Sequence, residues 1–306
     1  MKTILVTGSN GLLGQKITEA VLSGKQFHLV ATAKGLNRFK HQEGYQYAEM
    51  DITDAEQVRA VIEKFKPDAV IHTAALTNVD KCQAQQELAD QLNVEAVKIL
   101  TDICTLHDIQ LVHLSTDFIF DGAAGPYDEL AVPNPLSYYG GTKFEAEKVV
   151  SSSKCRWAIL RTILVYGVIS DQNRSNIVLW AKGALEKGTP IQVVNDHWRM
   201  PTLADDLADS CLLAVEKEAT GFFNISGREM MSVSELVFRV AGFWGLDSTL
   251  ITEVSSALLN ESAKRPVKTG FIIDKAINEL GYSPRSFAEG LALVDLQLKE
   301  RALNIK

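Results

Sequence analysis

The N-terminal segment constrains the fold more than any other part of the chain. Residues 2–6 form a short apolar run, and the glycine-rich loop TGSNGLLG (residues 7–14) follows directly, ahead of a helical pattern. In a GxxGxxG loop, Gly8 and Gly11 let the backbone turn tightly beside a pyrophosphate, and Gly14 lets the helix pack on the strand. The helix N-terminus offers free N–H groups to the anion. The segment therefore predicts a dinucleotide-binding unit; a glycine-rich turn without a ligand is the alternative.

The pattern along the chain predicts an α/β fold with a Rossmann-type doubly wound parallel sheet, because strand and helix patterns alternate through the first half. Strands are expected at residues 2–6, 27–33, 46–50, 69–74, 110–115 and 157–162, and helices at 12–22, 55–65, 86–106 and 137–150. We expect an NAD(P)-binding domain over residues 1–164 and a smaller mixed α/β substrate-binding domain over 165–306. Residues 190–225 are expected to return to the first domain.

The composition is that of an ordinary globular protein. Hydrophobic residues make up 46% and charged residues 23% of the 306, which excludes disordered and coiled-coil classes. The net charge of −7 argues against a general nucleic-acid or acidic-membrane binder. No stretch approaches the ~18 apolar residues of a membrane span, so we expect a cytoplasmic protein. No HExxH or CxxC spacing predicts a metal site, and His72 and His113 are expected as core residues of strands.

The end of the second predicted strand bears on the choice of cofactor. A carboxylate there binds the ribose 2′-hydroxyl of NAD, whereas cations suit the 2′-phosphate of NADP. Residues 31–38 include no acid but contain Lys34 and Arg38, so we predict a preference for NADPH. Ordinary solvated loop cations are the alternative, and use of NADH stays open. Asp51 and Ile52, after the third strand, are expected to receive the adenine or to begin the next helix.

Tyr139 and Lys143 are the main catalytic candidates. They stand four residues apart on a predicted helix, so both project from one face. A nearby ammonium favours the phenolate, and we expect it to lower the pKa of Tyr139, as proton transfer near neutrality requires. An amphipathic helix with a surface lysine is the alternative.

Ser115, Thr116 and Asp117 end the fifth predicted strand. Ligands of open α/β sheets bind outside the carboxyl ends of the strands, so these side chains are expected where a nicotinamide and its substrate meet. A hydroxyl at that position is suited to hydrogen-bond a substrate carbonyl. Hydroxyls that only satisfy the loop backbone are the alternative.

Together these motifs resemble the extended short-chain dehydrogenase/reductase family. The glycine loop, the Ser-Thr-Asp segment and YGGTK (139–143) carry that resemblance. It is narrowed to the dTDP-4-dehydrorhamnose reductases by AALTNVDK (74–81), LN (92–93), STDFIFDG (115–122), RT (161–162), NDHWRMPT (195–202) and KRP (264–266). The resemblance implies NADPH-dependent reduction of the C4 ketone of a nucleotide-linked deoxysugar, above all of dTDP-4-dehydro-L-rhamnose to dTDP-L-rhamnose.

The resemblance also implies a role for each matching residue. Tyr139 would protonate the developing alkoxide, Lys143 would hold the nicotinamide ribose and Thr116 would polarise the carbonyl, with Asp117 beside them. The residues implied to hold the cofactor are Gly8, Asn10, Gly11, Leu12, Leu13, Gly14, Lys34, Arg38, Asp51, Ile52, Ala74, Ala75, Thr77, Asn93, Ser115, Tyr139 and Lys143. Those implied to contact the substrate are Val79, Asp80, Thr116, Phe118, Leu164, Trp198 and Arg265.

One departure from the family pattern leaves the sugar open. The family has a tryptophan shortly after the Arg-Thr pair, where this chain has Leu164, so another nucleotide-sugar ketoreductase stays an alternative. A non-catalytic regulatory subunit, like the β subunit of methionine adenosyltransferase, is a second alternative. An epimerase or dehydratase with tightly held NAD⁺ is a third. The sequence also leaves open a homodimer and a requirement for Mg²⁺.

Overall fold

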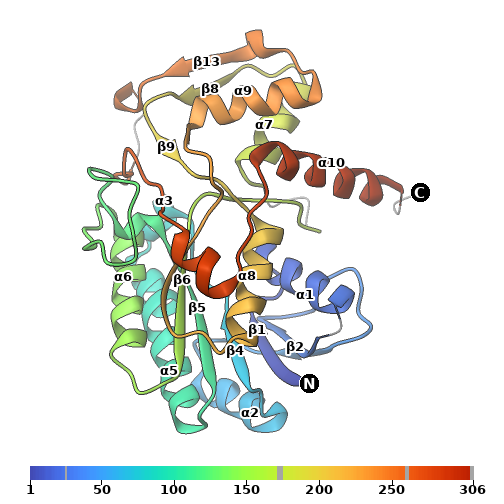
Figure 1. Ribbon diagram of the computed structural model, residues 1–306, viewed down its shortest axis with the longest axis vertical. Helices are drawn as coiled ribbons and strands as arrows, with labels where there is room; N and C mark the ends of the chain where they lie inside the picture. The colour runs from blue at the N-terminus through green and yellow to red at the C-terminus, as the bar shows by residue number, and fades with distance from the viewer. Residues whose placement is uncertain (25, 171–174, 259–261, 304–306) are drawn as a thin grey trace.

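The structure, a computed structural model, describes residues 1–24, 26–170, 175–258 and 262–303, and in them a seven-stranded parallel sheet forms the larger part of the molecule (Figure 1). The strand order is β11-β6-β5-β4-β1-β2-β3. The direction of winding changes between β1 and β4, so the predicted doubly wound sheet is confirmed. The strands are β1 (Lys2–Thr7), β2 (Phe27–Ala33), β3 (Gln46–Glu49), β4 (Ala69–His72), β5 (Gln110–Thr116), β6 (Trp157–Thr162) and β11 (Gly221–Ile225).

Helices cover both faces of this sheet, because side chains alternate along each strand. On β1, Ile4 and Val6 belong to the core under α1 and α8, whereas Leu5 belongs to the core under α2, α5 and α6 (Figure 1). The single helix predicted over residues 86–106 is divided by a π-helical turn, η1, and the sequence pattern does not predict α3. The helical elements are α1 (Leu12–Gly24), α2 (Ala55–Phe65), α3 (Val79–Ala84), α4 (Gln86–Asp90), η1 (Gln91–Glu95), α5 (Ala96–Leu106), η2 (Asp117–Ile119), α6 (Tyr138–Ser151) and α8 (Ala204–Glu216).

A smaller lobe lies over the carboxyl ends of the strands (Figure 1). In its described part, β7 pairs with β10, β9 with β12 and β8 with β13, and helices α7, α9 and α10 enclose a separate core. The elements of this lobe are β7 (Val165–Tyr166), α7 (Ile177–Glu186), β8 (Ile191–Val194), β9 (Trp198–Arg199), β10 (Thr202–Leu203), β12 (Met231–Ser232), α9 (Val233–Trp244), η3 (Ser248–Leu250), β13 (Ile251–Val254), η4 (Ser256–Leu258) and α10 (Phe287–Leu303). The π-helical turn η5 (Ala276–Leu280) packs instead on α8 and β11 of the larger part.

The stretch 190–225, expected to return to the first domain, is divided between the two regions. Helix α8 packs on α1, and β11 pairs with β6 as an edge strand of the large sheet. Strand β8 pairs instead with β13, because Ile191 and Val193 are buried in the core of the smaller lobe. Conversely, Phe271 and Tyr282 from the C-terminal part of the chain belong to the core of the large sheet. Among the described helices, none is long and apolar enough to cross a membrane.

Candidate functional site

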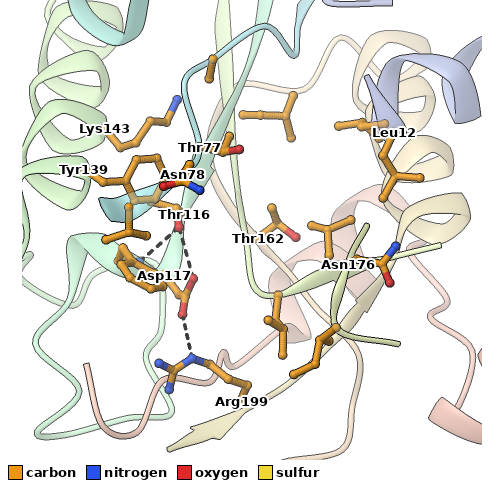
Figure 2. Close-up of a pocket in the computed structure, with 18 of the residues that line it drawn as sticks. Leu12, Thr77, Asn78, Thr116, Asp117, Tyr139, Lys143, Thr162, Asn176 and Arg199 are labelled. Carbon is orange, nitrogen blue, oxygen red and sulfur yellow. Dashed lines mark hydrogen bonds and ion pairs between the residues drawn. The ribbon is translucent and has the colours of Figure 1, made fainter. Parts of the chain in front are cut away.

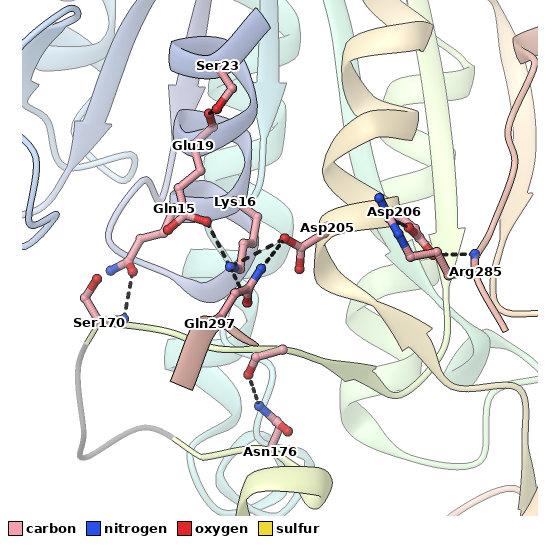
Figure 3. Close-up of polar contacts among 11 residues, drawn as sticks. Gln15, Lys16, Glu19, Ser23, Ser170, Asn176, Asp205, Asp206, Arg285 and Gln297 are labelled. Atoms are coloured by element: carbon pink, nitrogen blue, oxygen red, sulfur yellow. Dashed lines mark hydrogen bonds and ion pairs between the residues drawn. The ribbon is translucent and has the colours of Figure 1, made fainter. Parts of the chain in front are cut away.

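A cavity of about 1020 Å³ lies between the carboxyl ends of the strands and the smaller lobe (Figure 2). Residues 11–13, residues 72–79 at and after the end of β4, and residues 114–118 at and after the end of β5 form one side of it. The smaller lobe forms the other side, through parts of α7 and β8 and through the segment around Arg199. Its volume is at the upper end of the range for small-molecule sites. The cavity therefore lies where ligands of doubly wound sheets bind.

The glycine loop brings main chain close to this cavity. Gly8 has φ of 68°, which favours glycine, and a Cβ there would lie 2.8 Å from the backbone of Ala74. At Gly14, a Cβ would lie 2.5 Å from the carbonyl oxygen of Gly8, so only glycine lets α1 start against the loop. Gly11 and Leu12 line the cavity itself, and Figure 2 shows Leu12 in its wall. The N-terminus of α1 thus lies at the cavity, where helix N-termini are suited to hold an anion.

Buried polar atoms beside the cavity test whether the residues present fit a cofactor. Within the described chain, Ser9 Oγ, His72 Nε2 and Ser115 Oγ are buried and have no hydrogen-bond partner. Buried polar groups in folded proteins are nearly always hydrogen-bonded. His72 and Ser115 line the cavity, so ribose or phosphate oxygens of a dinucleotide would supply partners there. The residues present therefore fit a nicotinamide dinucleotide.

The predicted adenosine end of the site is built by contacts between the glycine loop and residues 34–38. Asn10 Nδ2 donates to the carbonyl of Leu36 at 2.9 Å, and Asn10 Oδ1 accepts from the backbone N–H of Arg38 at 2.8 Å. Lys34 Nζ lies 2.6 Å from Asp51 Oδ2. That hydrogen bond lowers the pKa of Asp51 and raises the pKa of Lys34. The residues predicted for the 2′-phosphate and the adenine therefore contact each other.

Two residues predicted to touch the cofactor are engaged in the protein interior. Ile52 is buried in the core under α2, because the apolar side chain after β3 turns inward. Asn93 Nδ2 donates to the carbonyl of Leu76 at 3.0 Å and to Thr142 Oγ1 at 3.1 Å, and its Oδ1 accepts from the backbone N–H of Leu76 at 2.8 Å. Asn93 thereby fixes the segment after β4 against α6.

Helix α6 carries Tyr139 and Lys143 into the cavity wall (Figure 2). The helix begins after Ser137, whose hydroxyl accepts a hydrogen bond from the backbone N–H of Gly140. A Cβ at Gly140 would lie 2.2 Å from the carbonyl oxygen of Phe118, so glycine is required for this close approach to η2, which follows β5. Tyr139 is 8% exposed and Lys143 4% exposed, which places both side chains in a nearly dry environment.

The electrostatics of this pair differ from the prediction. Burial raises the pKa of Tyr139, and a hydrogen bond with Thr116 opposes that rise. Burial lowers the pKa of Lys143 to about 8, and its ammonium lies 3.2 Å from Nε2 of His113. The expectation of a lowered pKa for Tyr139 is therefore wrong, because desolvation is the largest influence on it and the charge of Asp117 acts in the same direction. Tyr139 is therefore protonated at neutral pH.

Thr116 and Asp117 link the end of β5 to the smaller lobe. Thr116 Oγ1 donates to Asp117 Oδ1 at 3.2 Å. Asp117 Oδ2 accepts from Thr269 Oγ1 at 2.5 Å and lies 3.7 Å from Arg199 Nε (Figure 2). Burial raises the pKa of Asp117, and Arg199 and Thr269 oppose that rise. The carboxyl group thus connects Thr116 with two side chains from the other side of the cavity.

The predicted substrate residues divide between the cavity and its rim. Arg265 lines the cavity and pairs with Asp80 at 2.6 Å. Leu164 also lines it, with φ of 40°. Trp198 lies on β9, 39% exposed, beside Arg199. The predicted site residues that line the cavity are Gly11, Leu12, Leu13, Ala74, Ala75, Thr77, Val79, Ser115, Thr116, Asp117, Phe118, Tyr139, Lys143, Leu164 and Arg265.

Many residues that line the cavity were not among the predicted site residues, and His72, Asn176 and Trp180 are three of them. Asn176 caps α7 by accepting from the backbone N–H of Leu179 at 3.3 Å, and its Nδ2 donates to the carbonyl of Gly167 at 2.7 Å. An asparagine ahead of an apolar helical pattern is typical of a helix N-cap, so the sequence held that signal. Nothing in the sequence pattern marks His72 or Trp180 as ligand-facing.

Comparison with known proteins agrees with this geometry. The family model described as RmlD substrate binding domain matches residues 1–299. The crystal structure of a dTDP-4-dehydrorhamnose reductase from Clostridium acetobutylicum has a TM-score of 0.85 at 29% identity, covering 97% of this chain and 99% of that one. The structure of the reductase from Bacillus anthracis in complex with NADP has a TM-score of 0.82 at 25% identity, with the same coverage.

The chain is also similar to a protein whose name is not that of a reductase. Methionine adenosyltransferase 2 subunit beta of Xenopus tropicalis is 31% identical over 82% of this chain and 75% of that protein. The match of the family model over nearly the whole length is decisive for classification. The chain belongs to the RmlD substrate binding domain family, within the extended short-chain dehydrogenase/reductase group.

Proposed function

We propose that this NAD(P)H-dependent oxidoreductase, a nucleotide-sugar reductase of the dTDP-4-dehydrorhamnose reductase type, reduces the C4 ketone of a nucleotide-linked deoxysugar. The proposed substrate is dTDP-4-dehydro-L-rhamnose, the product dTDP-L-rhamnose and the preferred cofactor NADPH. One observation carries the proposal: Tyr139, Lys143 and Thr116 converge on a cavity that the glycine loop also lines (Figure 2). A proton donor, a cation and a hydroxyl beside a dinucleotide loop are the groups that carbonyl reduction needs.

The binding of the cofactor follows from the residues around the loop. Bound NADPH would supply the hydride. The backbone of the glycine loop and of the N-terminus of α1 would hold its diphosphate. The buried Ser115 hydroxyl and His72 Nε2, which lack partners in the described chain, would meet oxygens of the same molecule. Lys143 would bind the nicotinamide ribose.

Tyr139 would donate the proton. A ketone that accepts hydride builds negative charge on its oxygen, and a positioned donor neutralises that charge. Tyr139 is protonated because burial raises its pKa, and the hydroxyl of Thr116 lies next to it. As Tyr139 gives up its proton, the ammonium of Lys143 would stabilise the phenolate. Asp117 would orient Thr116 through the hydrogen bond between them.

The preference for NADPH rests on Lys34 and Arg38, at the end of β2 where a carboxylate would favour NAD. NADP in the reductase of Bacillus anthracis supports the same choice. The ion pair with Asp51 means that Lys34 has to share its charge between Asp51 and a 2′-phosphate. The backbone N–H of Arg38 donates a hydrogen bond to Asn10 of the glycine loop. Arg38 and Lys34 thus both belong to the segment that lies beside this loop.

The test is the rate of NADPH oxidation by the purified protein with a panel of 4-keto nucleotide sugars, with NADH in parallel. We expect the highest kcat/KM with dTDP-4-dehydro-L-rhamnose and a lower KM for NADPH than for NADH. Turnover of a different 4-keto sugar would show that the substrate is that sugar instead. Leu164 in the cavity wall makes this outcome a specific alternative. Absence of oxidation with every sugar would reject the reductase assignment.

Similarity to methionine adenosyltransferase 2 subunit beta favours a second candidate, a regulatory subunit without turnover. A pull-down that retains a methionine adenosyltransferase, together with no NADPH oxidation, would support that candidate. The convergence of Tyr139, Lys143 and Thr116 favours the enzyme. An epimerase or dehydratase would instead be purified with stoichiometric NAD⁺.

A further inference from the structure

Two imidazole rings lie buried beside Lys143. Strands β4 and β5 are parallel neighbours whose register pairs His72 with His113, so both side chains leave the sheet on the same face. The ring centroids are 5.5 Å apart and the ring planes meet at 23°, a stacked arrangement. His72 is 2% exposed and His113 fully buried. The mechanism proposed above leaves His113 without a role.

His113 contacts the ammonium of Lys143 directly. The distance from His113 Nε2 to Lys143 Nζ is 3.2 Å, and both side chains are buried. An ammonium only donates hydrogen bonds, so Nε2 carries the lone pair and the ring proton is on Nδ1. Nδ1 itself is buried and has no hydrogen-bond partner in the described chain. Burial and the adjacent charge of Lys143 hold the pKa of His113 well below its usual range. His113 is therefore a neutral acceptor.

The other charged and titratable groups that face Lys143 act differently. On α6, Tyr139 lies one turn before Lys143 and Glu147 one turn after it. Glu147 raises the pKa of Lys143 through space, but its carboxylate oxygens are bound to Arg161. From β4, the stacked ring of His72 contributes no charge, because burial lowers its pKa to about 3. Within the described chain, the hydrogen bond of Lys143 goes to His113.

We propose that His113 is a positioning residue that anchors one N–H of the Lys143 ammonium, so that the other N–H groups point into the cavity toward the ribose of a nicotinamide cofactor. The inference rests on the proposed function for the identity of the cofactor. A hydrogen-bond acceptor favours the charged form of Lys143. Without the His113 acceptor, the ammonium of Lys143 therefore loses its proton at a lower pH. The cofactor then loses the contact with Lys143 at that lower pH.

The experiment measures NADPH affinity across pH by fluorescence titration, without any sugar. Affinity of the unmodified protein should fall as the pH rises through about 8, where Lys143 loses its charge. The midpoint is the pH at which half of this change in affinity has occurred. His113→Phe keeps a ring but removes the acceptor, and should lower the midpoint by about one pH unit. His113→Gln places an amide oxygen near the position of Nε2 and should restore the midpoint. His107→Phe, which removes an exposed imidazole, is the matched control and should leave it unchanged.

An unchanged midpoint in His113→Phe, or an equal downward shift in His113→Gln, would overturn the proposal. Thermal unfolding of each variant shows whether it is folded. Should the phenylalanine variant not fold, His113→Asn replaces it, because its shorter amide leaves Nζ without an acceptor. The midpoint in His113→Asn should then fall, and a midpoint equal to that of the unmodified protein would overturn the proposal. If the midpoints move as expected while no sugar is reduced, the substrate assignment fails and the role of His113 stands.

Discussion

The ion pair between Glu147 and Arg161 shows how the helix that carries the proposed catalytic residues is held on the sheet. Glu147 lies on α6, one turn after Lys143, and accepts from Arg161 Nε at 3.0 Å and from Nη2 at 2.8 Å. The two side chains are 2% and 3% exposed. Glu147→Gln would leave the guanidinium of Arg161 charged in a dry environment. Breaking a buried ion pair from one side costs about 3–5 kcal/mol of the free energy of unfolding.

The expected change in melting temperature follows from the length of the chain. With an unfolding entropy of about 2.1 cal/mol/K per residue, 306 residues give about 0.6 kcal/mol/K. A loss of about 3–5 kcal/mol then lowers the Tm by about 5–8 °C, which calorimetry resolves easily. Glu145→Gln is the control on the same helix. Its carboxylate pairs with Lys148, but the side chains are 55% and 52% exposed, so the shift should stay below about 1 °C.

The same variant should also alter the site. Because Glu147 raises the pKa of Lys143, its neutralisation should lower the pH above which NADPH affinity declines. A Tm shift for Glu147→Gln no larger than that for Glu145→Gln would refute the reasoning. It would mean that the charge of Arg161 is accommodated without the carboxylate, and that burial here carries no energetic penalty.

Three further variants test the rest of the cavity. Gly14→Ala should weaken NADPH binding at least about tenfold in a titration, because the new methyl group would lie 2.5 Å from the backbone of the glycine loop. Gly242→Ala is the control and should leave binding unchanged, because no atom lies within 4 Å of the added methyl group. Lys34→Ala should raise the KM for NADPH more than that for NADH, whereas equal changes would show that Lys34 only pairs with Asp51. Arg265→Met should raise the KM for the nucleotide sugar with little change in kcat, and a loss confined to kcat would contradict a role in binding.

The large sheet was predictable because its strands are buried on both faces. Such strands are continuous apolar runs, and the six predicted in the first half agree with β1 to β6 within two residues at each end. The division of the helix predicted over residues 86–106 was not predictable, since the apolar period continues through η1. The π-helical turn lies where the amide of Asn93 is bound to Leu76 and Thr142, partners far away in the sequence.

The residues of the site were easier to predict than their interactions. The motifs located Tyr139 and Lys143 on one helix, but the pKa of Tyr139 depends on burial that only the packed structure shows. The contact of Lys34 with Asp51 likewise joins the ends of β2 and β3, which the sequence separates by a loop. The position of β8 in the smaller lobe depends on pairing with β13, about 60 residues later. Each of these is a tertiary contact without a local pattern.

The central claim is that Tyr139 donates the proton when a 4-keto nucleotide sugar is reduced. The most direct measurement compares kcat for dTDP-4-dehydro-L-rhamnose reduction in the unmodified protein and in Tyr139→Phe, with NADPH affinity measured in both. We expect kcat to fall at least about 10²-fold while NADPH affinity changes by less than about threefold. Near-normal turnover in Tyr139→Phe would contradict the claim.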